Sequence, residues 1–312
     1  MTKDILHITN GDSLTDRLHQ LALIDGDCFV WREMLCEGPT LIRTESLESL
    51  QNRKEFLEKY YRITPNDYEQ KFVSQLSKLD DRKRYKEIIL WFEYDLFCHM
   101  NMVAAISLLL RKGFEKVPIF LVCSGRIEGE SKCFGLNELS DSQLITHLKN
   151  KKQLTVDDLQ LASHIWTLYC EENPNKIAGQ IKASSSFEYL SICLKAHLER
   201  FPNAKTGLNT LETNILKMID TYQIKNMKQL MGYALEYQGF YGYGDMQMKR
   251  IIAKLFQFLD QTGEQLILSE RGKLVLQEKK NFYNTTAADW YYGGVNKYHY
   301  LYNTDTRNLM KL

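Results

Sequence analysis

Apolar residues in the first 138 positions fall into short continuous runs that alternate with segments of helical spacing. Runs rich in β-branched and aromatic residues predict strands at positions 5–9, 27–31, 87–92 and 117–123. The intervening segments 12–23, 46–61 and 96–112 are predicted to be helices. Continuous apolar strands separated by helices are typical of a parallel sheet that is covered on both faces. We therefore predict an α/β domain over residues 1–138, built on a doubly wound, mostly parallel sheet.

Between residues 139 and 202 the pattern is helical. Helix-start signals at Ser140 and Thr155 predict a helical segment over residues 139–202. In residues 203–312, three amphipathic stretches at 209–222, 226–237 and 245–259 precede the segment ILSERGKLVL. That segment fits two short strands, or a strand, a turn and a helix. Three helices followed by a β-hairpin are the layout of a winged helix, so we expect a winged-helix-like domain with an aromatic C-terminal tail over residues 203–312.

Length and charge agree with this division. A chain of 312 residues is long enough for two or three domains. Its net charge is only +1, but residues 1–202 carry 26 Lys and Arg against 29 Asp and Glu, whereas residues 203–312 carry 14 against 10. A basic end on a neutral carrier is compatible with a module that faces nucleic acid. The seven cysteines include no CxxC pair, which predicts free thiols.

No membrane partner is expected. The longest apolar run is well short of the roughly 20 residues that a spanning helix needs. The first residues also lack the pattern of a secretory leader. The sequence therefore predicts a soluble, cytoplasmic protein.

The letters GDSLTD at positions 11–16 are those with which many GDSL-type esterases present a nucleophilic serine. Such an enzyme also needs a GxND block and a downstream DxxH block, but here GxND is absent and the only DxxH lies on the predicted helix of Ser13 itself. Ser13 and Asp16 instead match the pattern of a capping box at a helix start. We expect Ser13 to cap this helix rather than to attack a substrate.

Acidic residues follow two of the predicted strands. Asn10, Gly11 and Asp12 come after the first strand, and Glu93 and Asp95 come after the strand at 87–92. Ligands of open α/β sheets bind beyond the carboxyl ends of the strands, and a helix start there favours a phosphorylated ligand. If the two strands are neighbours, the three carboxylates converge in a set that suits Mg²⁺.

Other interpretations of the acidic residues at this edge of the sheet stay open. The layout of one acid after the first strand and a pair after a later one is similar to that of the toprim domain of topoisomerases and primases. The structural alternative is that Asp95 caps the following helix while Glu93 pairs with an arginine such as Arg32 or Arg126. Glu37, in the CEGP loop, is a further candidate for the pocket or a turn residue. Ser13, at the start of the first predicted helix, is also a candidate for the ligand site.

The predicted winged helix offers cations to a duplex. Its third helix would be the recognition helix, with the remaining cations in the wing. The candidate nucleic-acid-binding residues are Gln247, Lys249, Arg250, Lys254, Arg271 and Lys273. Winged helices are also used for protein contacts. The aromatic residues between Trp290 and Tyr302 could stack on exposed bases, but a tail of this kind more often docks onto the body of the protein.

Several motifs together resemble one bacterial family, which is designated domain of unknown function 1835, with its usual C-terminal companion domain. The matching stretches are LHITNGD, CEGP, WFEYDLF, HLERFPNAKTGLNTLE and WYYGGV, and they extend over nearly the whole chain. Members often carry histidine where Tyr94 stands, and Asp-Gln where Cys98 and His99 stand. The resemblance supports the fold prediction and implies no particular reaction.

Two functions fit these patterns. One is a regulator associated with duplex DNA or another nucleic acid, whose α/β domain binds a small phosphorylated ligand or a divalent cation. The other is a Mg²⁺-dependent enzyme that acts on a phosphoester or a nucleotide. The sequence contains neither GxxxxGK[ST] nor GxGxxG, which argues against the common nucleotide-binding folds for either function.

Overall fold

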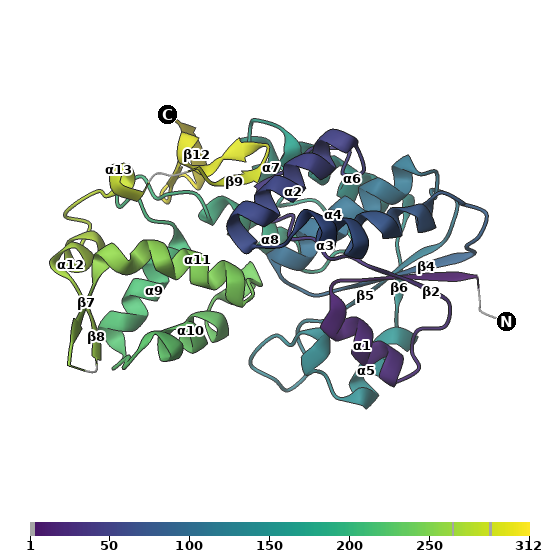
Figure 1. The fold of residues 1–312 in the computed structure, drawn as a ribbon, viewed down its shortest axis with the longest axis horizontal. Coiled ribbons are helices and arrows are strands. Elements are labelled where there is room, and N and C mark those ends of the chain that lie inside the picture. Colours follow the sequence, from purple (N-terminus) through teal and green to yellow (C-terminus); the bar gives the residue numbers. More distant parts are fainter. Residues whose placement is uncertain (1–3, 264, 287–288) are drawn as a thin grey trace.

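The computed structural model describes residues 4–263, 265–286 and 289–312 (Figure 1). The first three residues, which belong to the stretch where no secretory leader is expected, lie outside the described residues. So do residues 264, 287 and 288 of the predicted C-terminal domain.

A five-stranded sheet forms the core of the N-terminal part. Its strands are β1 (Ile5–Thr9), β2 (Asp27–Val30), β4 (Glu87–Phe92), β5 (Ile119–Cys123) and β6 (Lys152–Gln153). They lie in the order β2-β1-β4-β5-β6, with the first four parallel and β6 antiparallel to β5. The predicted α/β class and mostly parallel sheet are confirmed. The chain moves from β1 outward to β2 and then returns to the other side of β1, so the strand order reverses between β1 and β4.

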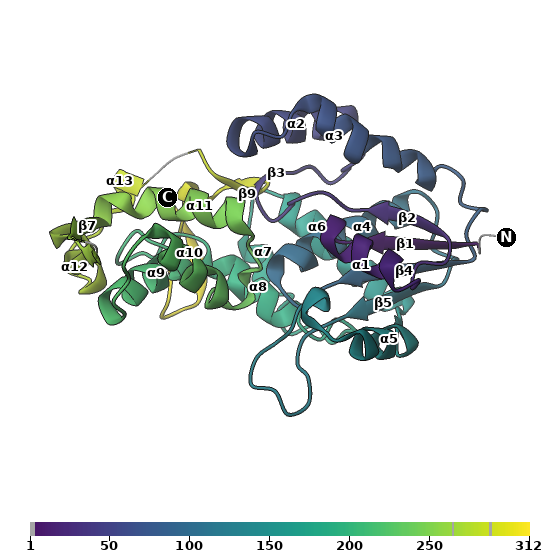
Figure 2. The same cartoon turned by 60° about the horizontal axis from the view of Figure 1, so that its bottom comes forward.

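Helices cover both faces of this sheet (Figures 1 and 2). One face carries α1 (Asp12–Gln20) and α5 (Asp141–Lys149); the other carries α2 (Leu47–Tyr61), α3 (Pro65–Lys71), α4 (Leu96–Arg111) and α6 (Val156–Cys170). Alternate residues of β4 serve the two cores: Ile89 and Trp91 belong to the cluster under α1, whereas Ile88, Leu90 and Phe92 belong to the larger core. Burial on both faces is the reason that this strand is continuously apolar.

Side-chain caps begin most of the helices that the sequence predicts. Ser140 accepts a hydrogen bond from the N–H of Gln143, and Thr155 accepts one from Asp158, which confirms both predicted starts. The predicted cap at Ser13 is wrong. Helix α1 begins at Asp12, after Gly11 with φ +106°, and no side chain caps it. The glycine turns the chain into the helix before Ser13 is reached, so this serine lies in the first turn, where its Oγ contacts Asn137 Nδ2 at 3.2 Å.

The chain leaves the sheet through short helices and enters a second, helical part (Figure 1). The elements there are α7 (Asn175–Ala178), α8 (Leu190–Glu199), α9 (Thr210–Thr221), α10 (Met227–Glu236), α11 (Asp245–Leu255), β7 (Leu259–Thr262), β8 (Gln265–Leu268) and α12 (Glu270–Leu276). The segment ILSERGKLVL forms a strand followed by a helix, the second of the two expected alternatives. Three helices and a hairpin follow one another, but the β7–β8 hairpin ends at Leu268. The expectation that Arg271 and Lys273 lie in the wing is therefore wrong, because the cap at Ser269 starts α12 and both residues belong to that helix. The assignment to the winged-helix fold stays a prediction.

The C-terminal tail returns to the N-terminal part. It contains α13 (Tyr283–Thr286), β9 (Tyr291–Gly293), β10 (Val295–Asn296), β11 (Tyr300–Asn303) and β12 (Asn308–Lys311). Strand β9 pairs in parallel with β3 (Gly38–Pro39). Trp290, Tyr292 and Tyr298 are buried, so the expected docking of the aromatic tail is confirmed.

Short 3-10 helices complete the structure. They are η1 (Val73–Leu79), η2 (Leu136–Glu138), η3 (Gly239–Tyr241), η4 (Phe256–Phe258) and η5 (Lys297–His299). Among the described residues, every helix is too short or too polar to cross a lipid bilayer.

Candidate functional site

The reversal of strand order brings two loops together at the carboxyl edge of the sheet. Strands β1 and β4 are parallel neighbours with Thr9 opposite Trp91, and the N–H of Asn10 donates to the carbonyl of Trp91 at 3.2 Å. The residues after β1 therefore lie beside Glu93 and Asp95, which follow β4. This is the crevice in which open α/β sheets bind ligands.

Three potential metal ligands meet in this crevice. One ligand atom each of Glu93, Asp95 and Cys98 lies within 4.8 Å of the other two. Asp95 is the N-cap of α4, and its Oδ1 accepts from the N–H of Cys98 at 2.8 Å. The thiol therefore lies on the first turn beside the carboxylate that caps it. Capping by Asp95, the structural alternative, is confirmed; in the described part of the chain, Glu93 has no arginine partner.

Hydrogen bonds fix the side chains of this cluster. The N–H of Leu136 donates to Glu93 Oε1 at 2.6 Å, and Asn10 Nδ2 donates to Cys98 Sγ at 2.9 Å. Asn101 Nδ2 donates to Asn10 Oδ1 at 2.8 Å, which orients the amide of Asn10 toward the sulfur. The expected role of Asn10 at the site is thus supported by a direct contact with the cluster.

Burial disfavours negative charge at all three groups. Desolvation, followed by the charge of Asp95, raises the pKa of Glu93 to about 7. Burial also raises the pKa of Asp95, although backbone N–H groups oppose the shift. The pKa of the Cys98 thiol is raised well above its usual value by burial and then by the two carboxylates. The cluster therefore concentrates acidic groups that a nearby positive charge would help to ionise.

The helical part of the chain closes over this cluster. Gly242, at φ +69°, follows η3, and a side-chain carbon there would overlap the carboxylate of Asp95. A carbon at Gly135 would lie 2.9 Å from Glu93 Oε1. Both glycines allow the backbone to approach the carboxylates closely. The crevice is thus formed by the N-terminal and C-terminal parts together.

Three of the predicted ligand-site residues lie elsewhere. Asp12 does not join the carboxylates, because Arg32 binds it, with Nε donating at 2.8 Å to Oδ1 and 3.0 Å to Oδ2. Ser13 contacts Asn137 on the surface. Glu37 is fully buried and pairs with Arg250 at 3.5 Å. The expectation of a three-carboxylate cluster that includes Asp12 is therefore wrong, and Cys98 occupies the third position.

The third helix of the C-terminal part does not present all of its polar residues to solvent. Gln247 is buried; it accepts from the N–H of Gly244 and donates to the sulfur of Met34. The Arg250 guanidinium lies 3.7 Å from the ring centre of Trp290 and 4.0 Å from that of Tyr60. Lys254 Nζ donates to Tyr298 Oη at 2.9 Å.

The expectation that Gln247, Arg250 and Lys254 face a duplex is therefore wrong. The aromatic tail covers Arg250 and Lys254, and α2 also covers Arg250. Gln247 packs instead against Met34 in the loop after β2. Burial, and then the charge of Lys297, lowers the pKa of Lys254 to about 7, which makes it a poor phosphate ligand. Lys249, Arg271 and Lys273 are exposed, and their contact with nucleic acid stays a prediction.

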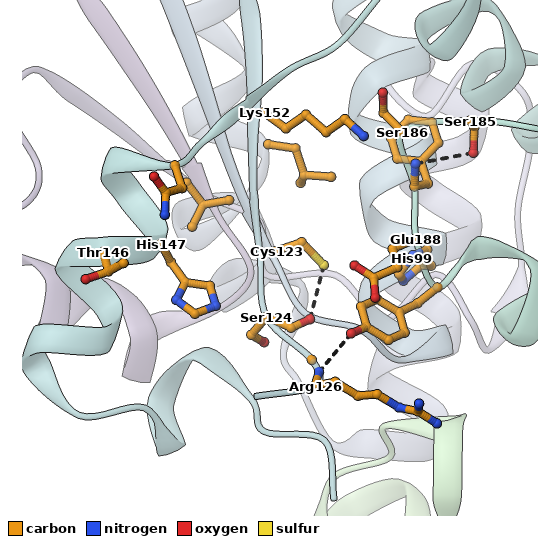
Figure 3. A pocket seen from close by; sticks show the side chains of 16 residues that line it. His99, Cys123, Ser124, Arg126, Thr146, His147, Lys152, Ser185, Ser186 and Glu188 are labelled. Carbon is orange, nitrogen blue, oxygen red and sulfur yellow. Dashed lines mark hydrogen bonds between the residues drawn. The ribbon is translucent and has the colours of Figure 1, made fainter. Parts of the chain in front are cut away.

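Two cavities flank the cluster. One, of about 460 Å³, lies beyond β1 and β2 and is lined by Asn10, Gly11, Asp12, Trp31 and Arg32, among others. The other, of about 510 Å³, lies beyond the carboxyl end of β5 (Figure 3). His99 lines this second cavity, and its Nδ1 donates to the carbonyl of Asp95 at 2.9 Å. Both volumes lie in the range of small-molecule sites.

Sequence reasoning missed the residues of the second cavity and the role of Cys98. The spacing of Asp95 and Cys98 held a signal, because the third helical residue always lies beside the N-cap side chain. Arg126, His147 and Lys152 come from a loop, a helix and an edge strand. Their proximity depends on the fold, and no local pattern in the sequence indicates it.

Comparisons with known proteins do not supply a family. No family model matches the chain. No curated protein matches it either. A solved structure of the DNA-binding, cleavage and re-ligation domain of Plasmodium falciparum topoisomerase II superposes with a TM-score of 0.46 and 14% sequence identity. The match covers 83% of this chain and 42% of that one, so the chain spans about two fifths of its length. A similarity of this size does not establish a shared fold.

Proposed function

We propose that this protein is an enzyme that acts on a phosphoester with the help of a divalent cation held by Glu93, Asp95 and Cys98. The observation that carries the proposal is the convergence of three ligand atoms within 4.8 Å of one another. They converge in the crevice where the strand order reverses, the usual ligand site of this class of sheet.

The acid–base state of the cluster supports a cation. The pKa values of all three groups are raised because each anionic form is desolvated, and a neighbouring carboxylate adds to the effect at Glu93 and Cys98. A positive charge between the groups favours their ionised forms. Binding should therefore release protons and strengthen as the pH rises.

The ligand atoms favour a different ion from the one expected from the sequence. Mg²⁺ prefers oxygen ligands alone, whereas a thiolate favours softer ions such as Zn²⁺. With two carboxylates and one thiol, the cluster fits Zn²⁺ better than the Mg²⁺ that the sequence suggested. When bound, such an ion polarises a phosphoryl oxygen and lowers the pKa of a coordinated water.

The residues of the chain supply position and protons around the ion. Asp95 is held by the first turn of α4, and Cys98 is held by Asn10. Glu93, with a pKa of about 7, can take up or release a proton near neutral pH when it is not bound to a cation. The backbone at Gly242 packs closely against the Asp95 carboxylate from the side of the helical part.

The test begins with metal binding. Calorimetry on protein stripped with EDTA should detect one Zn²⁺ site in the wild type. The site should be lost in Glu93→Gln, and Cys98→Asp should shift the preference toward Mg²⁺ and Mn²⁺. Asp12→Asn is a matched control, because Asp12 pairs with Arg32 outside the cluster. Equal Zn²⁺ binding by the wild type and Glu93→Gln would contradict the proposed site.

The second step is activity. Hydrolysis of p-nitrophenyl phosphate and of its bis ester should require the metal, fall with Glu93→Gln and persist with Asp12→Asn. Thermal melts of each variant separate loss of the site from loss of the fold. The wild type could bind Zn²⁺ and yet hydrolyse neither ester with Zn²⁺, Mn²⁺ or Mg²⁺. That result would contradict the proposed enzyme and indicate a metal-binding protein.

A regulator associated with nucleic acid is the second candidate. The order of α9, α10, α11 and the β7–β8 hairpin supports a winged-helix assignment. The exposed cations Lys249, Arg271 and Lys273 are available for phosphate contacts. The inward orientation of Arg250 and Lys254 reduces the charge that this surface offers, which is why the enzyme is favoured.

We also propose that the chain belongs to the family designated domain of unknown function 1835. The motifs of the resemblance occupy structurally important positions: Asn10 and Glu93 lie at the cluster, and Glu37 and Trp290 lie at the contact between the two parts. An alignment of further members that preserves these contacts would test the assignment.

A further inference from the structure

The cavity of about 510 Å³ beyond β5 is lined by more cations than carboxylates. Arg126 and Lys152 both line it, and they lie at opposite ends of the view in Figure 3, with Ser124 and His147 between them. Lys151, the neighbour of Lys152, is paired with Glu87, but no carboxylate in the described part of the chain lies within ion-pair distance of Arg126 or Lys152. Glu188 is the one carboxylate in the lining.

A buried hydroxyl in the same cavity has no partner. Ser124, directly after β5, is 1% exposed, and its Oγ has no hydrogen-bond partner among the described residues. Buried polar atoms in proteins are normally satisfied by protein, water or a ligand. Ser124 lines the cavity, and a turn of its buried hydroxyl toward a ligand there would supply the missing partner.

The walls of the cavity are held in place. Tyr189 Oη accepts from the N–H of Arg126 at 2.8 Å, and a side-chain carbon at Gly125 would overlap the Tyr189 hydroxyl, so the turn is packed tightly on this ring. His147 Nδ1 donates to the carbonyl of Gln143 at 2.8 Å. The imidazole therefore keeps Nε2 for the cavity, into which its ring points in Figure 3.

We propose that this cavity binds a small molecule that carries two anionic groups, at least one of them a phosphate, with one group at Lys152 and the other at Arg126. His147 Nε2 contacts the part between the groups, and Ser124, once its hydroxyl turns toward the cavity, donates to the group at the Arg126 end. The volume admits a sugar bisphosphate or a nucleotide and excludes a duplex.

The inference deepens the proposed function, on which it rests for the idea that the substrate is phosphorylated. The cavity adjoins the metal cluster through two contacts. His99 lines the cavity and donates to the carbonyl of Asp95, and Cys123, opposite Phe92 in the sheet, lines it one strand from Glu93. A ligand bound there would lie beside the proposed cation.

The test measures binding without metal. The full chain is titrated calorimetrically in EDTA with pyrophosphate, fructose 1,6-bisphosphate and adenosine 3′,5′-bisphosphate, and with fructose 6-phosphate as a probe with one anionic group. At least one bisphosphorylated probe should bind, and the monophosphate should bind about tenfold more weakly or worse, because a charged contact is lost. Failure of all three bisphosphorylated probes, or equal affinity for the monophosphate, would overturn the inference.

Single variants locate the site. Lys152→Ala and Arg126→Ala should each lower the affinity for the best probe about tenfold or more, and Ser124→Ala should lower it less. Lys149→Ala is the matched control, because Lys149 is an exposed cation near Lys152 that does not line the cavity. Wild-type affinity in both Lys152→Ala and Arg126→Ala would place the ligand elsewhere.

The outcomes for the two proposals are separable. Probe binding is measured in EDTA, where no cation is present, so it reports on the cavity alone. Loss of Zn²⁺ binding with normal probe binding bears only on the cluster, whereas normal Zn²⁺ binding without probe binding contradicts only the cavity.

Discussion

Arg250 and Glu37 are separated by 213 positions in the sequence, yet the Nη1 atom of the arginine lies 3.5 Å from Oε2 of the glutamate. Glu37 is fully buried, and the side chain of Arg250 is 14% exposed. Tyr61 Oη also donates to Glu37 Oε2. This ion pair joins the α/β part to the helical part, and the Trp290 ring of the tail lies against the guanidinium.

Removal of Arg250 should destabilise the fold strongly. Arg250→Ala leaves a buried carboxylate without its cation, a change that costs about 3–5 kcal/mol. Arg250→Met combined with Glu37→Gln should recover most of this loss, because no charge is left buried. Denaturant unfolding measures both. Lys249→Ala, at the exposed neighbour, should stay within about 0.5 kcal/mol of the wild type. A similarly small effect of Arg250→Ala would show that the ion pair does not stabilise the contact.

Ser13 should tolerate replacement. Gly11 precedes the helix, and among the described residues the side chain of Ser13 is hydrogen-bonded only to Asn137, on the surface. Ser13→Ala should therefore change the free energy of unfolding by less than about 0.5 kcal/mol. Thr155→Ala provides the comparison, since Thr155 caps α6 and its loss should cost about 1 kcal/mol. Equal losses of stability in the two variants would show that Ser13 does cap α1. Labelling of Ser13 by a fluorophosphonate would show that it is a nucleophile.

The sequence predicted the sheet well because its signals are local. The four long strands, the helix starts at Ser140 and Thr155, and the neighbouring loops after β1 and β4 all follow from apolar runs and capping residues. Periodicity also identified α11 as amphipathic. It did not show that its polar face is covered, because the covering residue Trp290 lies about 40 positions further along and two separate parts of the chain contribute the contact.

The candidate site was predicted in part for the same reason. Glu93 and Asp95 follow one strand, so their proximity is local. Asp12 was assigned to them on strand order alone, and the choice of Arg32 as its partner depends on side-chain directions that no pattern gives. Lys152 and Arg126 become neighbours of one cavity only after β6 has been added to the sheet.

Gly242 should be sensitive to a single added carbon. Gly242→Ala meets two costs: the backbone at φ +69° disfavours any Cβ by about 1 kcal/mol, and the new carbon overlaps the Asp95 carboxylate. Gly239→Ala is the matched control, because φ is +72° and nothing lies within 4 Å of the added carbon. Denaturant unfolding should show a larger loss for Gly242→Ala, and Zn²⁺ affinity should fall only there. Equal losses of stability in the two variants would show that the backbone at Gly242 does not pack tightly against Asp95.

The free energy of unfolding of the metal-free protein should depend on pH because of Glu93. Its pKa rises from 4.5 to about 7 on folding, so between these values the folded state holds a proton that the unfolded state has lost. Stability contributed by Glu93 therefore falls as the pH rises through this window. Partial exposure screens the effect, and we expect a difference of about 1–2 kcal/mol.

The measurement compares the wild type with Glu93→Gln in EDTA. The free energy of unfolding of the wild type, relative to the variant, should fall between pH 4.5 and pH 7.5. Other groups, such as His99 with its lowered pKa, titrate in both proteins and cancel in the comparison. Parallel pH profiles would show that Glu93 ionises as an ordinary surface carboxyl.

Duplex binding should depend on the cations that remain exposed. Lys249, Arg271 and Lys273 can neutralise at most three phosphates. The slope of log K against log salt should therefore be shallow, between zero and about −2.7. Replacement of all three by glutamate should abolish retardation of a duplex in a gel at low salt, whereas Arg250 is unsuitable for this test because its loss unfolds the contact with Glu37. The matched control reverses three exposed lysines of the N-terminal part, Lys83, Lys116 and Lys149, and should retain binding. If the wild type and the first triple variant migrate alike, the three helices and the hairpin are assigned to a protein contact. The proposed function then rests on the cluster of Glu93, Asp95 and Cys98 and on the cavity beside it.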